Sequence, residues 1–433
     1  MTRTPVPTAC PRCGSDLTLA VPGSLPWCGT CEWNLDVHDK RLAPWRGTVL
    51  LGRWGFRRGA VLDDRARERL QADPGAPAPA RTRGEVWLTA LTGLLAVVFV
   101  ALLLYLAWLV LGTDLPVGVR LLLALPAVAL LLLLRPVVPT LPKGLAVGAD
   151  AAPELHALIR DVADAVGAPP PDVVAIDSSI NAGVAQVGWR QQSLLVIGMP
   201  LWLTLPRAAR LSVLAHEMGH LVGGDPLRMR RTLPARTFGA RAVAATGGRN
   251  PWSRAFSGGA SAAEQGGGLL GFVIHGAVAV VNVVAATVQL LVDSVAMPDS
   301  RLAEYRADLV AVRVAGTRAF LESFETSLVA HYVWEDLWHI APRIEPDDLE
   351  RSAAVGLETA ASRVRAERQL TRRTTDLWST HPSADQRMRL VESLPTTEPT
   401  LTVSDERWQR VDAELAPWRR RTHRALLGSR DRL

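Results

Sequence analysis

Two histidines with the spacing of metal ligands stand in the stretch HEMGH, at residues 216–220. On an α-helix, residues four apart lie one above the other, so His216 and His220 can direct ring nitrogens at one ion. Glu217 would then lie beside the ion without binding it, where a carboxylate can accept a proton from metal-bound water. The resulting hydroxide would attack a polarised carbonyl. The motif alone is a weak signal, because a helix with two surface histidines has the same pattern.

A candidate for the third metal ligand stands in SRLAEYRAD, at residues 300–308. A catalytic zinc needs three protein ligands and one open position. Glu304 and Asp308 are one helical turn apart and share a face, so Glu304 could complete the site. Asp308 could accept a hydrogen bond from a ligand imidazole and fix its tautomer. The alternative is a solvated pair of carboxylates on a helix surface.

All four cysteines lie within residues 10–31, in two Cys-x-x-Cys pairs separated by 14 residues. Four thiolates from two tight turns can close a tetrahedral structural zinc site that has no open position. Such a ribbon would be a structural or docking module; the alternative is a redox dithiol or a loop without metal. The rest of the chain cannot form a disulfide, which favours a reducing compartment. The predicted ligands are Cys10, Cys13, Cys28 and Cys31.

The composition favours a membrane protein with a soluble part. Of 433 residues, 48% are hydrophobic and 21% are charged. The formal charge of +6 is carried almost wholly by arginine. Arginines beside membrane spans produce such a balance as readily as nucleic-acid binding does. The ribbon has too few basic and aromatic residues for nucleic-acid binding, so we expect no nucleic-acid partner.

Two apolar runs predict a transmembrane hairpin. Val86–Gly112 has 27 residues without a charge, which is long enough to span a bilayer. Leu121–Leu134 is shorter and lies between Arg120 and Arg135, so it is a span, a re-entrant segment or an interfacial segment. Arginines before the first run and after the second indicate that both flanks are cytoplasmic. The first 30 residues contain no apolar signal region, so we expect no cleavable signal peptide.

A third uncharged run covers Gly266–Val292. His275, Asn282 and Gln289 recur in it every seven positions, along one side of a helix. The run is either a lipid-facing helix whose polar stripe faces protein or water, or a buried core helix. Pro298 is expected to end it, and a new helix is expected to start at Asp299 or Ser300.

The intervening region has the pattern of a globular domain. Pro153–Val166 carries a helical apolar stripe, and GAPPP follows it. Asp172–Asp177 and Leu194–Gly198 are predicted strands on either side of a turn-rich piece. Thr204–Pro206 supplies a cap and a proline before the helix that carries HEMGH. The arginine-rich and glycine-rich stretch Arg228–Gly268 is a hypothetical lid.

The motifs together resemble the integral-membrane zinc metallopeptidases of the HtpX and CAAX-prenyl-protease type. The resemblance rests on HEMGH with Asp225 five residues after His220, on SRLAEYRAD, on the apolar insertion between them, and on THPSADQR at residues 380–387. It covers roughly Leu141–Leu394 and the two spans before it. The N-terminal ribbon is not part of this resemblance.

The resemblance implies a role for each matching residue. It implies zinc binding by His216, His220 and Glu304, proton transfer by Glu217, support by Asp308, a substrate-binding edge strand near Asn181 and Ala182, and participation of His381 and Arg387. A cation beside the metal could stabilise the oxyanion; alone, His381–Arg387 is also compatible with an ordinary helix start. Gly183 and Val184 replace the usual aromatic residue and alanine, which leaves the substrate preference open.

We therefore expect an α+β zincin-like metallopeptidase domain, mostly helical with a small β-sheet, plus transmembrane helices and a zinc ribbon. The predicted divisions are a ribbon at 1–45, a basic Pro/Ala-rich linker at 46–84, the hairpin at 85–140, the peptidase domain at 141–395 with an apolar insertion at 266–297, and a C-terminal tail at 396–433.

The predicted function is that of a membrane-anchored zinc endopeptidase acting on a peptide or protein substrate. One zinc would be catalytic and a second structural. The chain would be a multi-pass protein of a bacterial-type plasma membrane, with its N-terminus and active site facing the cytoplasm. The alternative is a membrane-tethered binding or sensor protein whose ribbon recruits a partner and whose peptidase site is idle. The sequence selects neither a substrate nor an oligomeric state.

Overall fold

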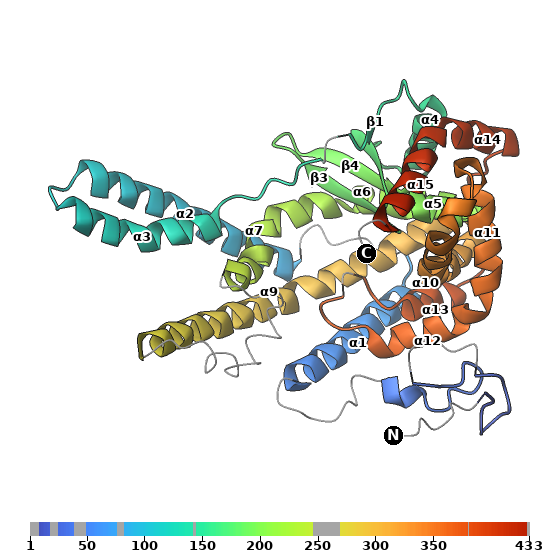
Figure 1. Cartoon of the computed structure of the whole chain (residues 1–433), viewed down its shortest axis with the longest axis horizontal. Coiled ribbons are helices and arrows are strands. Elements are labelled where there is room, and N and C mark those ends of the chain that lie inside the picture. The colour runs from blue at the N-terminus through green and yellow to red at the C-terminus, as the bar shows by residue number, and fades with distance from the viewer. Residues whose placement is uncertain are drawn as a thin grey trace.

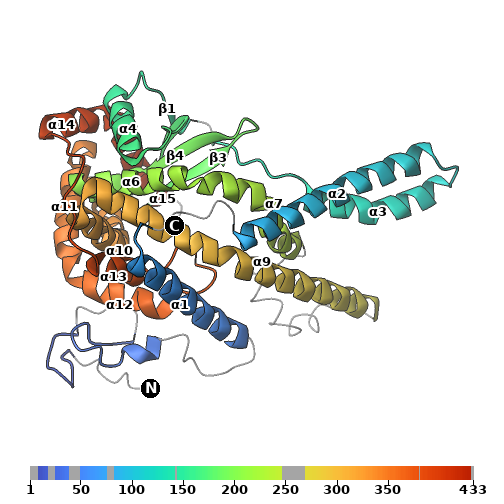
Figure 2. The same cartoon turned by 180° about the vertical axis from the view of Figure 1, so that it is seen from behind.

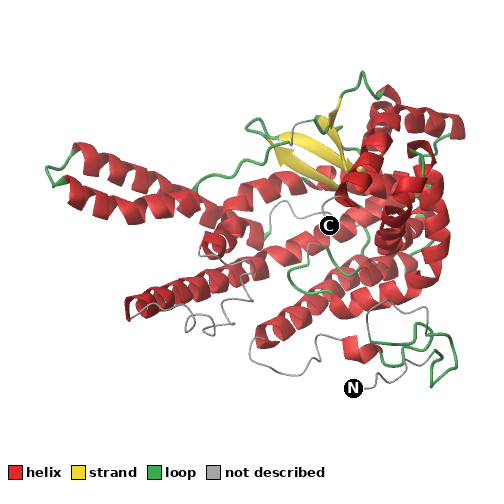
Figure 3. Cartoon of the chain, viewed as in Figure 1, coloured by secondary structure: helices red, strands yellow, loops and turns green. Residues whose placement is uncertain are grey.

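The computed structural model describes residues 8–17, 25–38, 49–75, 82–141, 144–245, 269–379 and 381–430. Helices make up most of the fold, and one small sheet lies at one side of it (Figure 1, Figure 3). The mixture of many helices and a small sheet agrees with the predicted fold class.

The sheet has four strands in the order β1-β2-β4-β3. The strands are β1 (Ala146–Val147), β2 (Val173–Asp177), β3 (Ala182–Val187) and β4 (Gln192–Gly198). β2 runs parallel to β4, whereas β3 pairs with β4 in the antiparallel direction and forms an edge. The sequence predicted β2 and β4 but not β3, because the small residues and glycine of AGVAQV lack the usual strand signal.

The main hydrophobic core lies between the sheet and the helices that follow it. Helix α4 (Pro153–Val166) has the predicted bounds and ends at Gly167, which adopts a left-handed φ of 83°. Its apolar stripe joins the core together with α5 (Met199–Thr204) and α6 (Arg207–Gly223). α6 therefore rests on a rigid base, since most of its inner face is buried in this core.

Three helices in the described part of the chain are long and apolar enough to cross a membrane. They are α2 (Arg83–Leu111), α3 (Val117–Leu134) and the part of α9 (Leu269–Ala315) that begins at Val280. The α2–α3 hairpin and the first half of α9 extend from the same side of the molecule in both views (Figure 1, Figure 2). This common direction is compatible with one bilayer around all three helices.

Helix α9 does not end at Pro298, so the predicted break there is wrong. The helix runs through this proline to Ala315. The missing hydrogen bond is outweighed by packing on both sides of Pro298 against α6, α7 (Asp225–Ala245) and α1 (Val49–Ala72). The helix that carries the third apolar run therefore also carries Glu304 and Asp308.

The polar stripe of α9 faces protein where the structure describes it. Gln289 is buried, accepts a hydrogen bond from the Ala240 amide at 3.1 Å and donates one to the Arg236 carbonyl at 2.8 Å. Val284 and Leu291 are exposed on the other side of the helix. This distribution fits a lipid-facing apolar side; the side chain of His275 lies outside the described residues.

Most of the predicted linker at 46–84 is helix α1 (Val49–Ala72), which corrects that prediction. The many charged residues of this helix made its narrow apolar stripe difficult to recognise in the sequence. Ala66 and Leu70 are buried in a small cluster with Leu302, Tyr305 and Leu390. α1 is thus packed on α9 and on α13 (Ala384–Glu392).

The remaining helices complete one side of the core. They are α10 (Thr317–Ile340), α11 (Leu349–Ala360), α12 (Val364–Thr374), α14 (Asp405–Glu414) and α15 (Ala416–Arg430). The predicted C-terminal tail is therefore folded, and Trp408 and Val411 of α14 belong to the main core. Residues 246–268 of the hypothetical lid lie outside the described residues.

Candidate active site

Helix α6 presents both histidines of HEMGH on one side. Pro206 precedes its first turn, and Gly224 ends it with a left-handed φ of 71° and hydrogen bonds to the carbonyls of His220 and Leu221. Leu214 and Met218 anchor the opposite side in the main core. Because the opposite face of α6 is packed in the core, the two imidazoles have a fixed direction.

α6 and α9 cross closely at Gly219. A Cβ atom there would lie 3.0 Å from the Cα of Ala307, which is closer than side chains normally pack. The small residues let the helix axes approach each other. Glu304 and Asp308 lie one helical turn apart on α9, on either side of Ala307 in the sequence. Both consequently face the histidines of α6.

The three predicted metal ligands converge. The two Nε2 atoms of His216 and His220 are 3.2 Å apart. Glu304 Oε2 lies 3.7 Å from His216 Nε2, and Glu304 Oε1 lies 3.6 Å from His220 Nε2. A tetrahedral zinc with bonds of roughly 2.1 Å separates its ligand atoms by about 3.4 Å. These residues therefore fit one zinc ion.

Each histidine also contacts a carboxylate through its other ring nitrogen. Asp308 Oδ1 lies 3.1 Å from His216 Nδ1, and Asp308 is completely buried. Asp225 Oδ2 lies 3.0 Å from His220 Nδ1. A carboxylate at Nδ1 fixes the tautomer that leaves the lone pair of Nε2 available to a metal. The contact of Asp225 was missed by sequence reasoning, although the residue was noted as part of the motif.

The ionisation of His220 reflects this environment. Burial disfavours its charged form, but the hydrogen bond to Asp225 and the nearby Glu304 raise the pKa of His220 to about 9. A metal ion must displace that proton before it can bind the ring nitrogen, so we expect metal binding to weaken as the pH falls.

Arg387 joins the two carboxylates of α9. Its Nε donates to Asp308 Oδ2 at 2.8 Å, its Nη2 donates to Asp308 Oδ1, and its Nη1 lies 2.9 Å from Glu304 Oε2. Burial opposes the charge, but these carboxylates raise the pKa of Arg387. All three guanidinium nitrogens thus face carboxylates, and Nη2 also lies 3.3 Å from His216 Nε2.

His381 is the more accessible of the two predicted residues in this segment. Its Nδ1 lies 3.0 Å from Glu304 Oε2, while 54% of its side chain remains exposed. The imidazole therefore stands at the edge of the site, with one nitrogen toward Glu304. A substrate could approach the exposed part of the ring.

Glu217 and the Asn181–Ala182 pair complete the predicted set. Glu217 is buried, with 7% of its surface exposed, and follows His216 on α6. Ala182 begins the edge strand β3 and pairs with Ile197, while the Asn181 carbonyl accepts a hydrogen bond from Gly198. β3 packs against both α6 and α7. The structure thus brings the edge strand next to the helix that carries the two histidines.

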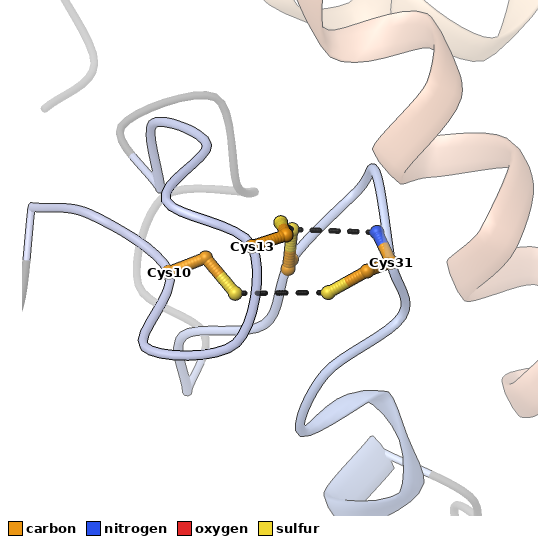
Figure 4. A group of neighbouring side chains, drawn as sticks. Cys10, Cys13 and Cys31 are labelled. Atoms are coloured by element: carbon orange, nitrogen blue, oxygen red, sulfur yellow. Dashed lines mark hydrogen bonds between the residues drawn. The ribbon is translucent and has the colours of Figure 1, made fainter.

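The four cysteines form a second cluster, of which Figure 4 labels Cys10, Cys13 and Cys31. Cys10 Sγ and Cys31 Sγ are 3.7 Å apart, and Cys13 Sγ and Cys28 Sγ are 3.5 Å apart. These separations are too long for a disulfide. They are close to the roughly 3.8 Å expected around a tetrahedral zinc with bonds of about 2.3 Å to sulfur. The four thiols therefore fit a closed metal site.

The cysteine cluster is docked on α12. Trp27 is buried against Ala366 and donates from Nε1 to Gln369 Oε1 at 3.2 Å. Gln369 Nε2 donates to the carbonyl of Gly29 at 2.8 Å. Arg372 pairs with Glu32 at 2.8 Å. The ribbon is consequently attached to the globular part through side chains that are separate from its cysteines.

Two imidazoles and a carboxylate around one point, with a further glutamate beside the first histidine, define a metallopeptidase type of metal centre. Comparison with known families agrees: the profile of peptidase family M48 matches residues 149–394, more than half of the chain. The chain therefore belongs to peptidase family M48. This membership confirms the resemblance and the zincin-like fold class, and it implies a zinc cofactor.

A curated relative supports the same assignment. The Protease HtpX homolog of Syntrophobacter fumaroxidans is 28% identical over 159 residues, which cover 36% of this chain and 52% of the relative. The chain thus spans about half the length of the curated relative it matches. No solved structure matches the chain.

Proposed function

We propose that the chain is a membrane-anchored zinc endopeptidase. The observation that carries the proposal is the convergence of His216, His220 and Glu304 at separations suited to one zinc ion. Membership of peptidase family M48 supports the same reaction class. In this proposal the three residues hold the ion, and a fourth position stays open for solvent.

The chain's own groups then divide the chemistry. A zinc ion bound there would supply an acidified water and polarise the substrate carbonyl. Glu217 accepts the proton of that water at its carboxylate and afterwards delivers it to the leaving amine. Its low exposure, 7%, limits its contact with bulk water. Asp308 and Asp225 hold the imidazoles in the tautomer that binds metal.

His381 and Arg387 have different roles in this mechanism. The exposed imidazole of His381 stabilises the negative charge on the substrate oxygen. Arg387 fixes the positions of the Glu304 and Asp308 carboxylates relative to each other, since its nitrogens contact both. In this proposal Arg387 is a positioning residue, and of the two candidates for the oxyanion, imidazole and guanidinium, the imidazole of His381 takes that role.

The substrate is an extended peptide or protein segment that pairs with β3. An edge strand has free main-chain groups along one side, and pairing through them holds a chain irrespective of its side chains. Asn181 and Ala182 mark the start of this strand. The side chains of the substrate would then be selected by the surroundings of β3, α6 and α7.

The membrane arrangement follows from the arginines that flank the hairpin. Arg83 precedes most of α2 and Arg135 follows α3, so the N-terminal ribbon and the active site face the cytoplasm of a bacterial-type plasma membrane. A reducing compartment also suits four free thiols, which bind the second, structural zinc. Peptide substrate and lipid are the expected partners; nucleic acid is not.

The test compares the purified protein with Glu217→Gln, which keeps the shape of the side chain but removes its basicity. We expect cleavage of a casein-type substrate to be lost while two zinc ions per chain are retained. Glu358→Gln is the matched control, because Glu358 is exposed on α11. Equal cleavage by the wild type and Glu217→Gln rejects Glu217 as the base. Cleavage by neither protein, with zinc bound, supports the binding or sensor alternative.

A further inference from the structure

Helix α1 precedes the region that matches the family, yet it contacts the segment leading into His381. Gly55, Gly59 and Asp63 follow one another at intervals of four and share one face of the helix. The carbonyl of Gly55 accepts a hydrogen bond from Leu377 at 3.0 Å. A Cβ atom on Gly59 would lie only 2.6 Å from the Asp376 carbonyl carbon. The two glycines therefore let the backbones of α1 and residues 376–377 touch.

Asp63 continues this contact into the interior. Its side chain is 3% exposed and forms an ion pair with Arg301, whose side chain is 2% exposed. Its second oxygen, Oδ2, accepts a hydrogen bond from the Ser383 amide at 3.3 Å. Burying a charge is costly unless its partners are arranged around it, and both partners of Asp63 are supplied by active-site elements.

Each partner stands about one helical turn from a residue of the site. Arg301 precedes Glu304 on α9. Ser383 directly precedes α13, and its carbonyl accepts a hydrogen bond from the Arg387 amide at 3.1 Å. Arg387 in turn reaches Glu304 with Nη1 at 2.9 Å. One carboxylate on α1 thus joins the two segments that must meet at Glu304.

We propose that Asp63 is a positioning residue for the peptidase site. By holding Arg301 and the Ser383 amide together, it sets the distance between α9 and residues 381–387, and so the placement of His381 and Arg387 beside Glu304. Asp63 touches none of the proposed metal ligands itself. The inference rests on the proposed function for its catalytic consequence, but the structural consequence can be measured without catalysis.

The main experiment uses Asp63→Asn in the full chain, with Glu68→Gln as the matched control. Glu68 is an exposed carboxylate on the same helix, so both changes remove one negative charge. We expect Asp63→Asn to lower kcat by up to about tenfold, the lower end of the range for direct partners of metal ligands, because Asp63 acts through Arg301 and Ser383. KM and the zinc content should stay unchanged, and amide hydrogen exchange should accelerate at residues 381–392. Kinetics and exchange equal to those of Glu68→Gln would overturn the inference.

A second variant covers the case in which Asp63→Asn does not fold. Gly59→Ala keeps both charges but forces α1 away from Asp376; Gly93→Ala is its control, because no atom lies within 4 Å of that Cβ position. We expect Gly59→Ala to show the same lowered kcat and faster exchange at residues 381–392, and wild-type values would overturn the inference. If neither the wild type nor Glu217→Gln cleaves the substrate, the proposed function fails, whereas the exchange measurement still decides the role of Asp63.

Discussion

The two candidate metal sites of this molecule are built in opposite ways. The four cysteines come from two neighbouring turns, and their thiols can surround an ion without help from the rest of the chain. The three residues of the peptidase site come from α6 and α9, which are far apart in sequence and approach closely at Gly219 and Ala307.

The surroundings of the two sites differ as well. The cysteine sulfurs accept hydrogen bonds mainly from backbone amides of the same turns. The Cys31 amide, for example, lies 3.4 Å from Cys28 Sγ. Each ligand of the peptidase site contacts a buried or half-buried charged side chain: Asp308, Asp225 or Arg387. A closed local site can be structural, whereas an open site with three ligands needs distant parts of the fold to hold its geometry.

The largest effect should come from His216→Ala. Removing this ligand should reduce cleavage to background and remove one of two zinc ions, because two remaining ligands cannot hold the metal in its working geometry. Metal analysis and a cleavage assay on the same sample measure both effects. His331→Ala, at an exposed position on α10, serves as the control. Full cleavage by His216→Ala would reject His216 as a ligand of the catalytic ion, and with it the description of the peptidase site as an open site with three ligands.

Asp308→Asn should have the next largest effect. Its buried carboxylate contacts both His216 and Arg387, so the amide should lower zinc affinity or kcat/KM by about 10–100-fold. Titration with a competing zinc chelator and steady-state kinetics distinguish the two. Unchanged values for both quantities would mean that the histidine is oriented by other contacts.

Asp225→Asn should have a smaller effect in the same direction. Asp225 contacts His220 but is less buried than Asp308, and water can replace part of its hydrogen bond. We expect zinc affinity at the peptidase site to fall by about tenfold, near the lower end of the range for such contacts. The same chelator titration measures this change. A loss larger than that of Asp308→Asn would reverse the ranking drawn from burial.

The smallest effect on cleavage should come from the double change Cys10→Ser and Cys28→Ser. These substitutions should remove the second zinc ion and loosen the ribbon on α12, with kcat/KM almost unchanged, because no cysteine contacts the peptidase site among the described residues. Zinc content and hydrogen exchange around Trp27 report the loss. Loss of cleavage as complete as that of His216→Ala would refute the separation of the sites.

Much of the local structure could be predicted from the sequence. Pro153–Val166 has the predicted bounds because its apolar periodicity, its first proline and its terminal glycine agree with one another. HEMGH and SRLAEYRAD identified residues that the structure brings together, since the two residues of interest in each motif share a helix face through their spacing alone. The predicted membrane hairpin likewise depends on length and apolarity.

The errors arose where distant contacts decide the outcome. The sequence of α1 was interpreted as a linker because the apolar stripe of this helix is short. The stripe is recognisable only from its packing against Leu302 and Tyr305. Pro298 is a local reason to end a helix, but the helices around α9 keep it continuous. Asp63 and Asp225 carry no local signal of their contacts with Arg301 and His220, so their roles required the fold.

The continuity of α9 has a mechanical consequence. Its exposed apolar half and Glu304 belong to one helix, and the axial distance from Leu291 to Glu304 is roughly 20 Å at the usual rise of an α-helix. If the apolar half spans a bilayer, a change in lipid thickness that alters its tilt also moves the carboxylate at the far end. The thickness of the bilayer would then change the rate of a reaction that takes place outside the bilayer.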